Sequence, residues 1–325
     1  MAKVKTFKTI FPAVSVPLND DYSINEPEFR AYLRWIKTFY GKGMDGLVCN
    51  GHTGEITGLT RAERKRVVEI CAEECGDVMT IISGVNCENT AESIEMAKEA
   101  KEAGADGILL MPPHMWLRFG MNPDAPFEYV KDVAEGADID IIIHLYPATS
   151  KAFYPVETLI KMCKEIDHVK CIKMGTRVTS IYEHDVRLLR QECQDISIIT
   201  CHDETLCVSW FPGMDGALIG FAGCVPEIIC PAREVFANPD KHTLKEAQDW
   251  SDRIYHISQA IYGGGQPSGE AHARLKEALK QRGIFSSALM RKPVLPLNQE
   301  EKDWVALGLE RSQLPEVDMA QFEDK

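Results

Sequence analysis

The sequence lacks a long hydrophobic run and an excess of basic residues, and each absence excludes a class of protein. The longest mainly apolar segments, such as 139–145, are too short to span a bilayer. The first ten residues contain cations but no apolar segment typical of a signal peptide, so we expect neither a membrane partner nor export. The net charge of −13 argues against nucleic acid as a partner, because a phosphate-backbone binder needs a basic face.

The sequence also has no Cys-x-x-Cys pair, and no glycine-rich dinucleotide-binding motif follows its first apolar segment. Its 11 cysteines are spread along the chain, and the spacing of Cys71 and Cys75 suits one helix face better than a zinc site. We therefore expect reduced thiols in a cytoplasmic protein. A small anionic substrate is compatible with the negative charge, because a local pocket can be positive in an acidic protein.

Short apolar segments alternate with amphipathic ones up to about residue 236. Continuous apolar strands that alternate with helices indicate a parallel sheet covered by helices. The predicted strands are 11–16, 46–50, 80–83, 107–111, 141–145, 170–173, 196–200 and 216–219. The predicted helices are 30–39, 61–75, 90–103, 127–135, 156–165, 181–193 and 226–236, followed by 244–262, 272–281 and 299–309.

A Gly-x-Asp-Gly pattern recurs at residues 43–46, 104–107 and 213–216, each time between a predicted helix and a predicted strand. Glycine ends a helix in the left-handed conformation without steric strain, and the aspartate can bind backbone in the turn. The spacings correspond to roughly two and four βα units of about 30 residues, which fits strands 2, 4 and 8 of one array. Eight such strands favour a (β/α)8 TIM barrel over an open sheet.

The chain is longer than a barrel of about 250 residues requires, and the surplus predicts an appendix. We place the (β/α)8 barrel in residues 1–236 and a C-terminal helical domain in residues 237–311. A break between its helices is expected at 263–267, where three glycines precede Gln and Pro. Residues 312–325 are acidic and are expected to form a frayed tail.

Three predicted strands end in residues suited to chemistry, and a barrel carries its active site at this end. The second ends in the turn 51–55, Gly-His-Thr-Gly-Glu, whose amides and Thr53 hydroxyl can bind a carboxylate; an ordinary loop is the alternative. The fifth ends at Tyr146, which shares the parity of His144 and is either a proton-relaying phenol or a core residue. The sixth ends at Lys173, where burial would lower the amine's pKa and favour attack on a carbonyl, unless the side chain extends to the rim.

Together these strand ends resemble the dihydrodipicolinate synthase / N-acetylneuraminate lyase superfamily. Further resemblance lies in Ala-Val-Ser-Val-Pro-Leu at 13–18, Gly-Met-Asp-Gly-Ala-Leu-Ile-Gly at 213–220 and Arg-Lys-Pro-Val-Leu-Pro-Leu at 291–297. The resemblance covers about residues 8–310. It implies a (β/α)8 barrel with a C-terminal helical domain, usually in a homotetramer. It also implies a class I lyase without metal or other cofactor, which forms a Schiff base with pyruvate or a pyruvate-derived 2-oxo acid.

The resemblance also implies a catalytic set of Lys173, Tyr146 and Thr53. Lys173 would form the imine, an electron sink that allows a carbon–carbon bond to be made or broken beside it. Tyr146 would shuttle protons to and from the reacting groups. The amides of His52 and Thr53, with the Thr53 hydroxyl, would bind the substrate carboxylate.

Five further residues are expected to shape the site by the same resemblance. Leu218 or Ile219 would form the wall beside the pyruvate methyl group. Glu55 would orient the turn and cap the next helix. Lys151 lies close to the place of an arginine that grips the second substrate of the synthase, and Trp116 could stack on an aromatic aldehyde, as in the aromatic hydratase-aldolases.

The sequence departs from the synthase proper at several of these positions. His52 stands where the synthase has threonine, and the stretch 113–116 contains no tyrosine to offer across a subunit interface. These changes count against lysine-biosynthetic activity and favour another acceptor of the aldehyde type. The alternatives are a keto-deoxy sugar acid dehydratase that uses the same lysine, a true dihydrodipicolinate synthase, or a non-enzymatic barrel that senses a 2-oxo acid. His114 and the pair His202-Asp203 have no assigned role.

Overall fold

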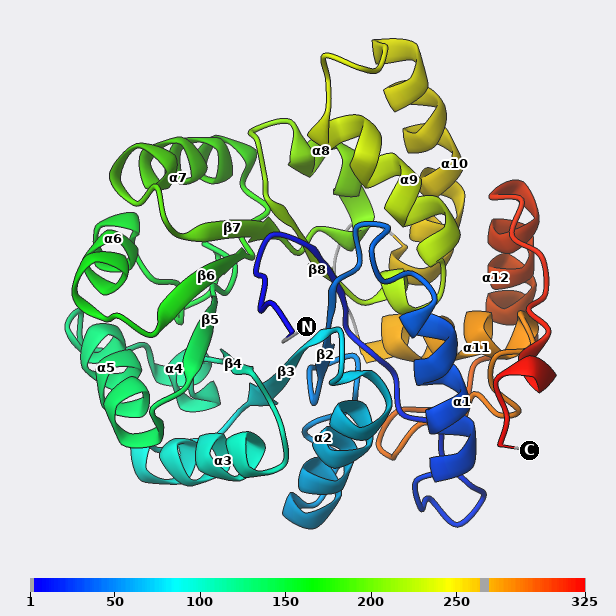
Figure 1. The fold of residues 1–325 in the computed structure, drawn as a ribbon, viewed down its shortest axis with the longest axis horizontal. Coiled ribbons are helices and arrows are strands. Elements are labelled where there is room, and N and C mark those ends of the chain that lie inside the picture. Colours follow the sequence, from blue (N-terminus) through cyan, green and yellow to red (C-terminus); the bar gives the residue numbers. More distant parts are fainter. Residues whose placement is uncertain (1–2, 264–268, 325) are drawn as a thin grey trace.

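The computed structural model describes residues 3–263 and 269–324, and its centre is a sheet of eight parallel strands. The order β1-β8-β7-β6-β5-β4-β3-β2 is closed by a hydrogen bond of 2.9 Å from Val14 N to Val48 O. This confirms the predicted (β/α)8 TIM barrel (Figure 1). The strands are β1 (Ile10–Pro12), β2 (Gly46–Cys49), β3 (Thr80–Val85), β4 (Gly107–Leu110), β5 (Asp140–His144), β6 (Val169–Met174), β7 (Ser197–Thr200) and β8 (Gly216–Ile219).

Helices cover the outside of the barrel in the alternating order that the sequence predicts (Figure 1). Capping side chains set several of their starts; Thr60 and Glu63, for example, form a reciprocal capping box at the second helix. The barrel helices are α1 (Glu26–Lys37), α2 (Arg61–Cys75), α3 (Thr90–Glu102), α4 (His114–Phe119), α5 (Ala125–Ala137), α6 (Val156–Glu165), α7 (Thr179–Glu192), α8 (Leu206–Trp210) and α9 (Pro226–Ala237). Within the described ranges, no helix is long and apolar enough to cross a membrane.

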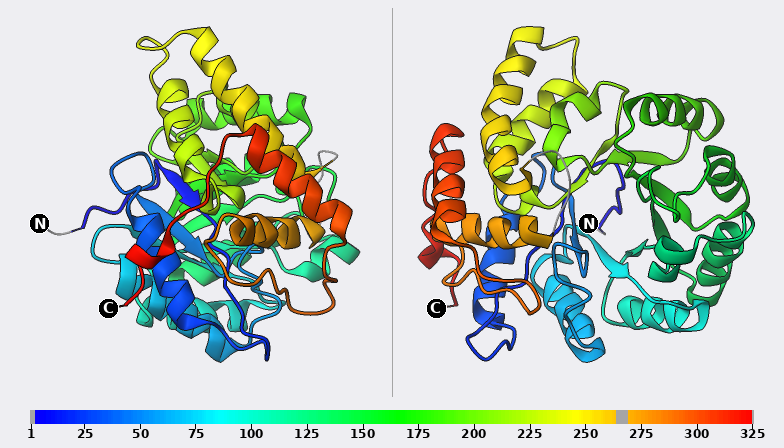
Figure 2. Two further views of the ribbon diagram at one scale, coloured as in Figure 1. Left: turned by 90° about the vertical axis from the view of Figure 1, so that its right-hand side faces the viewer. Right: turned by 180° about the vertical axis from the view of Figure 1, so that it is seen from behind.

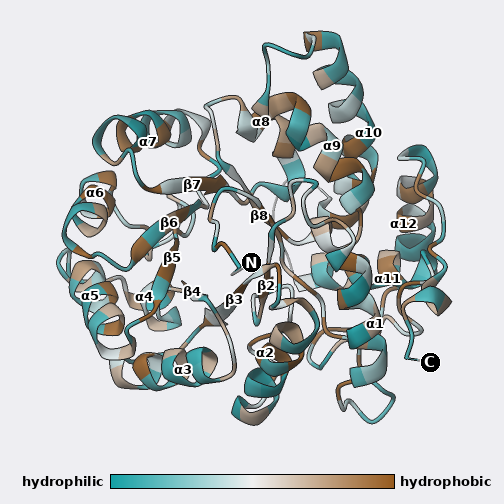
Figure 3. Cartoon of the chain, in the orientation of Figure 1, coloured by the Kyte–Doolittle hydropathy of each residue, from teal (hydrophilic) through white to brown (hydrophobic). Residues whose placement is uncertain are grey.

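The strands are mainly apolar, and brown segments stand out in several of them at the centre of the barrel in Figure 3. One face packs against the surrounding helices, and the other fills the barrel interior, so each strand is a continuous apolar segment. Alternation along a strand decides which side chains point inward. The interior cluster consists of Phe11, Ala13, Val48, Ile82, Leu109, Met111, Ile142, Cys171, Ile199 and Leu218.

The Gly-x-Asp-Gly turns hold the N-terminal ends of β2, β4 and β8. The three aspartates form hydrogen bonds in two different ways. The carboxylate of Asp45 accepts from the amide of Gly41, which lies in the same turn. Asp106 and Asp215 instead accept hydrogen bonds of 2.8 Å from backbone amides of the preceding strands, β3 and β7. The first glycine of each turn is left-handed, with φ of +95° at Gly43, +102° at Gly104 and +86° at Gly213.

Three further helices lie beside the barrel next to α9 and α1 (Figure 2). They are α10 (Leu244–Tyr262), α11 (Gly269–Gln281) and α12 (Gln299–Arg311), which pack on one another. The predicted break at 263–267 falls outside the described residues except for Gly263. The division into a barrel domain and a helical domain at residues 236 and 237 stays a prediction.

The C-terminal residues are packed onto the protein, so the expectation of a frayed tail is wrong. Leu314 is buried, and the amide of Val317 donates to the Arg282 carbonyl at 2.8 Å. The carbonyl of Phe322 accepts from the Arg34 guanidinium on α1 at 3.0 Å. The acidic side chains of this segment are exposed, whereas its apolar side chains pack against the protein and its backbone groups form hydrogen bonds. Composition alone does not reveal this packing.

Candidate active site

Lys173 lies at the C-terminal end of β6 and faces the barrel interior. It follows Cys171 of the interior cluster by two residues, and alternate residues of a strand share a face. Its Cα is in register with that of His144 on β5, which follows the interior residue Ile142 in the same way. The side chain of Lys173 is half-buried, so its amine lies at the mouth of the barrel above the closed apolar core.

The surroundings of Lys173 favour a neutral amine. Burial lowers the pKa of Lys173, because loss of solvent disfavours the ammonium form. The thiol of Cys201 and the carboxyl of Asp203 oppose this change in pKa, whereas the guanidinium of Arg177 adds to it. Arg177 is held there by Glu204, with Nε 2.6 Å from Oε1. A lowered pKa increases the fraction of the amine that can act as a nucleophile.

The phenol of Tyr146 lies among three histidine side chains just beyond β5. Its Oη is 3.3 Å from His52 Nε2 and 3.5 Å from His114 Nε2. The ring of His144 meets the Tyr146 ring edge to face, with centroids 5.0 Å apart. Burial raises the pKa of the Tyr146 phenol well above its ordinary value. The phenol is therefore protonated at neutral pH and can donate its proton to a reacting oxygen.

Burial keeps imidazoles at the mouth neutral. It lowers the pKa of His52 to about 3, with the charge of Lys173 as the next cause, and holds that of His144 well below its ordinary value. Burial also lowers the pKa of His272, on α11, to about 4, and the charge of Lys173 contributes there too. A neutral imidazole accepts a hydrogen bond on one nitrogen and donates from the other, so these groups can pass protons without carrying charge.

The turn after β2 lies beside Tyr146, because the His52 side chain of this turn contacts its phenol. A Cβ at Gly54 would lie 3.0 Å from the carbonyl oxygen of Val14, so this tight approach favours glycine. Among the residues that the structure describes, none accepts a hydrogen bond from the amides of His52 or Thr53. These amides and the buried Thr53 hydroxyl are arranged to bind an anion.

Tyr262, the last residue of α10, lies near Thr53. A Cβ at Gly220, just after β8, would lie 3.0 Å from Thr53 Oγ1 and 2.3 Å from Tyr262 Oη, so glycine permits both to approach. Asp203 Oδ1 accepts a hydrogen bond from Phe221 N at 3.1 Å, and the nearby Tyr262 phenol also favours its carboxylate. Burial nevertheless raises the pKa of Asp203 to about 6, because these bonds compensate only part of the lost solvation.

Not all of the predicted site residues reach the mouth. Leu218 belongs to the interior cluster, whereas Ile219 packs outward under the helices, so of the two only Leu218 can face a ligand in the barrel. Trp116 is buried, and its ring lies 5.7 Å from that of Tyr129 in an edge-to-face contact. Lys151 is exposed, and its Nζ donates to a backbone carbonyl of α4 at 3.1 Å.

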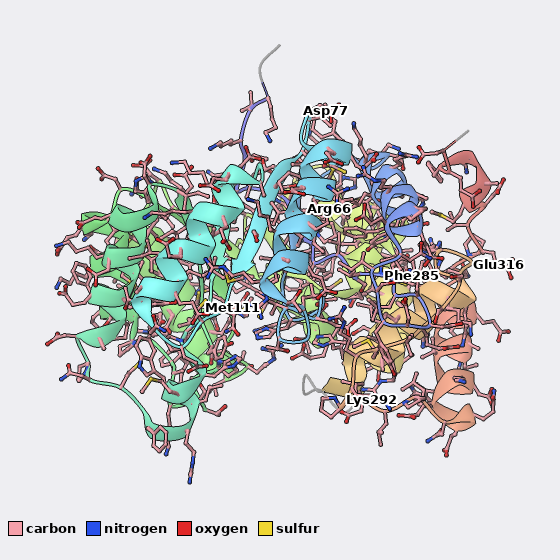
Figure 4. All side chains as sticks on the ribbon, turned by 90° about the horizontal axis from the view of Figure 1, so that it is seen from below. Arg66, Asp77, Met111, Phe285, Lys292 and Glu316 are labelled. Atoms are coloured by element: carbon pink, nitrogen blue, oxygen red, sulfur yellow. The ribbon has the colours of Figure 1, made fainter. Side chains whose placement is uncertain are left out.

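Glu55 joins the barrel to the C-terminal helices, so the expectation that it caps the next helix is wrong. Thr60 caps α2, whereas the Glu55 carboxylate pairs with the buried Lys276 of α11 and accepts from Arg291 N at 2.9 Å. Figure 4 shows Lys292, the next residue, at the side of the molecule opposite Asp77, which precedes β3. The segment after α11 therefore runs past the C-terminal ends of the strands.

Sequence reasoning missed several residues around the mouth. Tyr262 and His272 come from α10 and α11, far along the chain from the strand ends that carry the motifs. Arg177 is visible in the sequence only as a cation shortly after Lys173. His202, left without a role, packs with its ring 4.7 Å from that of Tyr182 on α7. No local pattern marks these residues, because Tyr262 and His272 reach the mouth only through the packing of the C-terminal helices, and Arg177 and His202 only through closure of the barrel.

Comparison with known proteins agrees with this architecture. The chain is 26% identical over 309 residues to a 4-hydroxy-tetrahydrodipicolinate synthase of Bartonella bacilliformis, covering 94% of this chain and 98% of the relative. It is 30% identical to an uncharacterised DapA-like lyase of Pyrococcus horikoshii, with 90% and 95% covered. A similar solved structure is that of YagE from E. coli K12, a protein of the dihydrodipicolinic acid synthase family in complex with pyruvate. The two structures match with a TM-score of 0.84 and 20% sequence identity, and the match covers 95% of this chain and 99% of that chain.

The fold and these relatives define a (β/α)8-barrel lyase. The chain belongs to the dihydrodipicolinate synthetase family, whose model matches residues 6–311. This membership confirms the family resemblance and the prediction of an enzyme of the lyase class.

Proposed function

We propose that the protein is a class I lyase that forms a Schiff base between Lys173 and pyruvate or a pyruvate-derived 2-oxo acid. The observation that carries this proposal is a lysine of lowered pKa at the end of β6, facing the interior of the barrel near a protonated tyrosine. The neutral amine adds to the keto carbon, and loss of water yields the iminium. The iminium withdraws electrons from an adjacent bond and so allows a carbon–carbon bond to form or break.

Each neighbouring group has a part in this chemistry. Tyr146 donates a proton to the carbinolamine oxygen, which leaves as water. The amides of His52 and Thr53, which have no acceptor in the described structure, bind the substrate carboxylate together with the Thr53 hydroxyl. Leu218, on the interior face of β8, forms the wall beside the methyl group. The pyruvate in the E. coli relative supports this choice of first substrate.

The second substrate is proposed to be a neutral carbonyl compound of the aldehyde type. The imidazoles of His52, His144 and His272 are neutral donors and acceptors, which suit a carbonyl or hydroxyl group better than a second carboxylate. Lys151 is engaged with α4, and Trp116 is buried against its neighbours, so neither side chain is placed to hold an acceptor without moving. The homotetramer and the cytoplasmic location stay predictions.

The Schiff base is tested by reducing the protein with borohydride in the presence of pyruvate and mapping the modified peptide. We expect alkylation of Lys173 in the wild type and none in Lys173→Ala. Lys170→Ala is the matched control, because Lys170 lies on the same strand but is exposed, and it should leave the adduct intact. A folded wild-type protein without an adduct at Lys173 would contradict the proposal.

A turnover panel separates this lyase from the alternatives. Incubation with pyruvate and a series of aldehydes should give an aldol product. Product from a keto-deoxy sugar acid alone would instead indicate a dehydratase, and dihydrodipicolinate-type product would indicate the synthase. Thermal stabilisation by pyruvate without any product would favour the sensor.

A further inference from the structure

Tyr146, His114 and Glu88 form a connected row from the barrel mouth to the surface. Glu88, in the loop after β3, accepts hydrogen bonds from the amides of His114 and Met115 at 3.2 and 2.9 Å, which fixes its carboxylate at the start of α4. Its Oε1 lies 3.9 Å from His114 Nδ1. The other ring nitrogen of His114, Nε2, lies 3.5 Å from Tyr146 Oη. One imidazole therefore stands between the exposed carboxylate of Glu88 and the buried phenol.

A neighbouring amide determines where the ring proton of His114 resides. Asn86 Nδ2 lies 3.3 Å from His114 Nε2, and an amide nitrogen can only donate. Nε2 must therefore accept, which leaves the proton on Nδ1 facing Glu88. When the Tyr146 hydroxyl, 3.5 Å away, donates to Nε2, it shares the single lone pair of that nitrogen with the Asn86 amide, and its oxygen can accept from His52 Nε2 at 3.3 Å. The hydrogen bonds consequently run in one direction, from His52 through the phenol to His114.

We propose that Glu88, His114 and Tyr146 form a proton relay within one chain, in which His114 is the positioning residue that takes up and returns the phenolic proton. This inference rests on the proposed Schiff base at Lys173. It adds to that proposal the group that activates Tyr146. The order of the three groups is that of a nucleophile–imidazole–carboxylate triad, with a phenol in the place of the nucleophile.

The relay has a defined role when the pyruvate iminium becomes an enamine. The methyl C–H bond breaks, and its electron pair forms the carbon–carbon double bond while the iminium nitrogen becomes neutral. The released proton goes to Tyr146 Oη as the phenol's own proton passes to His114 Nε2. The positive charge thus moves from the iminium to the imidazolium, which the Glu88 carboxylate stabilises, and the reverse step returns each proton.

Electrostatics favours this concerted route over a free phenolate. Burial raises the pKa of Tyr146, and the charge of Glu88 raises it further, so an isolated phenolate is disfavoured at this position. Passing the phenolic proton on as another arrives keeps Tyr146 neutral throughout. His52 is a poor substitute, because burial and the charge of Lys173 lower its pKa to about 3 and disfavour its cation.

The test follows exchange of the pyruvate methyl protons in D2O by NMR, which needs the imine and the base but no acceptor. His114→Ala should slow exchange by about 10²-fold or more while borohydride still alkylates Lys173. Added imidazole should restore part of the rate. Asn86→Asp should also slow exchange, because a carboxylate there holds a proton on Nε2 and blocks acceptance from Tyr146. The matched control is His168→Ala, since His168 also faces carboxylates, Asp138 and Asp140, but precedes β6 at the opposite end of the barrel.

Each other outcome overturns a defined part of the inference. Unchanged exchange in His114→Ala overturns the relay, and so does a wild type that traps pyruvate on Lys173 without exchanging its methyl protons. Slow exchange in His114→Ala that imidazole does not restore, together with wild-type exchange in Asn86→Asp, assigns His114 a purely structural role. Absence of any adduct in the wild type overturns the proposed function itself, and the relay with it.

Discussion

The residues at the barrel mouth suppress charge around Lys173. The imidazoles of His52 and His144 are held neutral and the phenol of Tyr146 is held protonated, and in each case burial is the largest cause. Burial also raises the pKa of Asp203 to about 6, but the carboxylate of Asp203 opposes the lowering of the Lys173 pKa. An amine in such surroundings loses its proton more readily than one in water, which is the condition that imine formation needs.

Replacing Asp203 should stabilise the protein at neutral and higher pH. Its pKa in the folded protein is about 6, against about 3.9 in an unfolded chain, so the ionised carboxylate disfavours folding above pH 6, and this penalty disappears as the pH falls through both values. Asp203→Asn keeps an acceptor for the Phe221 amide. We expect its free energy of unfolding to exceed that of the wild type by about 2 kcal/mol at pH 8, measured by denaturant titration.

The same variant should lose its advantage in acid. At pH 4 the wild-type carboxyl is largely protonated in the folded protein, so the two unfolding curves should nearly coincide. Asp195→Asn, at an exposed position before β7, serves as the control and should show no comparable change with pH. A constant difference between wild type and Asp203→Asn at both pH values would contradict this account.

Among the secondary-structure elements, the Gly-x-Asp-Gly turns show that one motif can have different structural consequences. The glycines behave alike, because the left-handed conformation is a local requirement of the helix end. The aspartates differ: Asp215 bonds to Ile198 N of β7, but Asp45 bonds within its own turn. Which amide is in reach depends on the register of the adjacent strand, and this lies outside the motif.

This difference predicts unequal effects of the same substitution. Asp215→Ala removes the acceptor of the amide of Ile198, a buried strand residue, and the partner of Arg190, 2.6 Å away, and should lower the free energy of unfolding by about 1–3 kcal/mol. Asp45→Ala removes a bond in an exposed turn and should lower it by less. Denaturant unfolding of both variants gives the comparison. Equal losses would show that the contact with β7 adds nothing to the stability of the turn.

In the molecule as a whole, the C-terminal helices complete the barrel mouth. The pair Glu55–Lys276 joins the turn after β2 to α11, and both side chains are almost fully buried. The same carboxylate holds the amide of Arg291, and α10 ends at Tyr262 beside Thr53. The turn that is proposed to bind the substrate carboxylate is therefore held from the C-terminal side of the chain.

Removing one charge of this pair should destabilise the protein more than removing both charges together. Glu55→Gln leaves Lys276 buried without a counter-charge, and Lys276→Met leaves Glu55 in the same state, so each should lower the free energy of unfolding by about 3–5 kcal/mol. The double variant removes both charges and should lose much less than the sum. A double-mutant cycle by denaturant unfolding measures the coupling, and strictly additive losses would contradict a direct interaction.

The barrel and part of its site follow from the sequence because their signals are local. Apolar strands, helix caps and left-handed glycines depend on neighbours within a few residues, and the ends of the apolar segments drew attention to Lys173 and Tyr146. Parity explains the partial success at β8, where the prediction left Leu218 and Ile219 open and only Leu218 faces the interior. The packed tail was missed because its partners, such as Arg34 on α1, lie far away in the sequence.

The row Glu88–His114–Tyr146 required the folded chain. Its members follow β3, β4 and β5, and of the three only Tyr146 has a sequence signal of its own. Closure of the sheet brings the ends of these strands together, because neighbouring parallel strands deliver their C-terminal loops to one rim. The sequence thus specifies the barrel, the lysine and the tyrosine through local periodicity, whereas the partners that tune their protons are set by long-range contacts across the mouth.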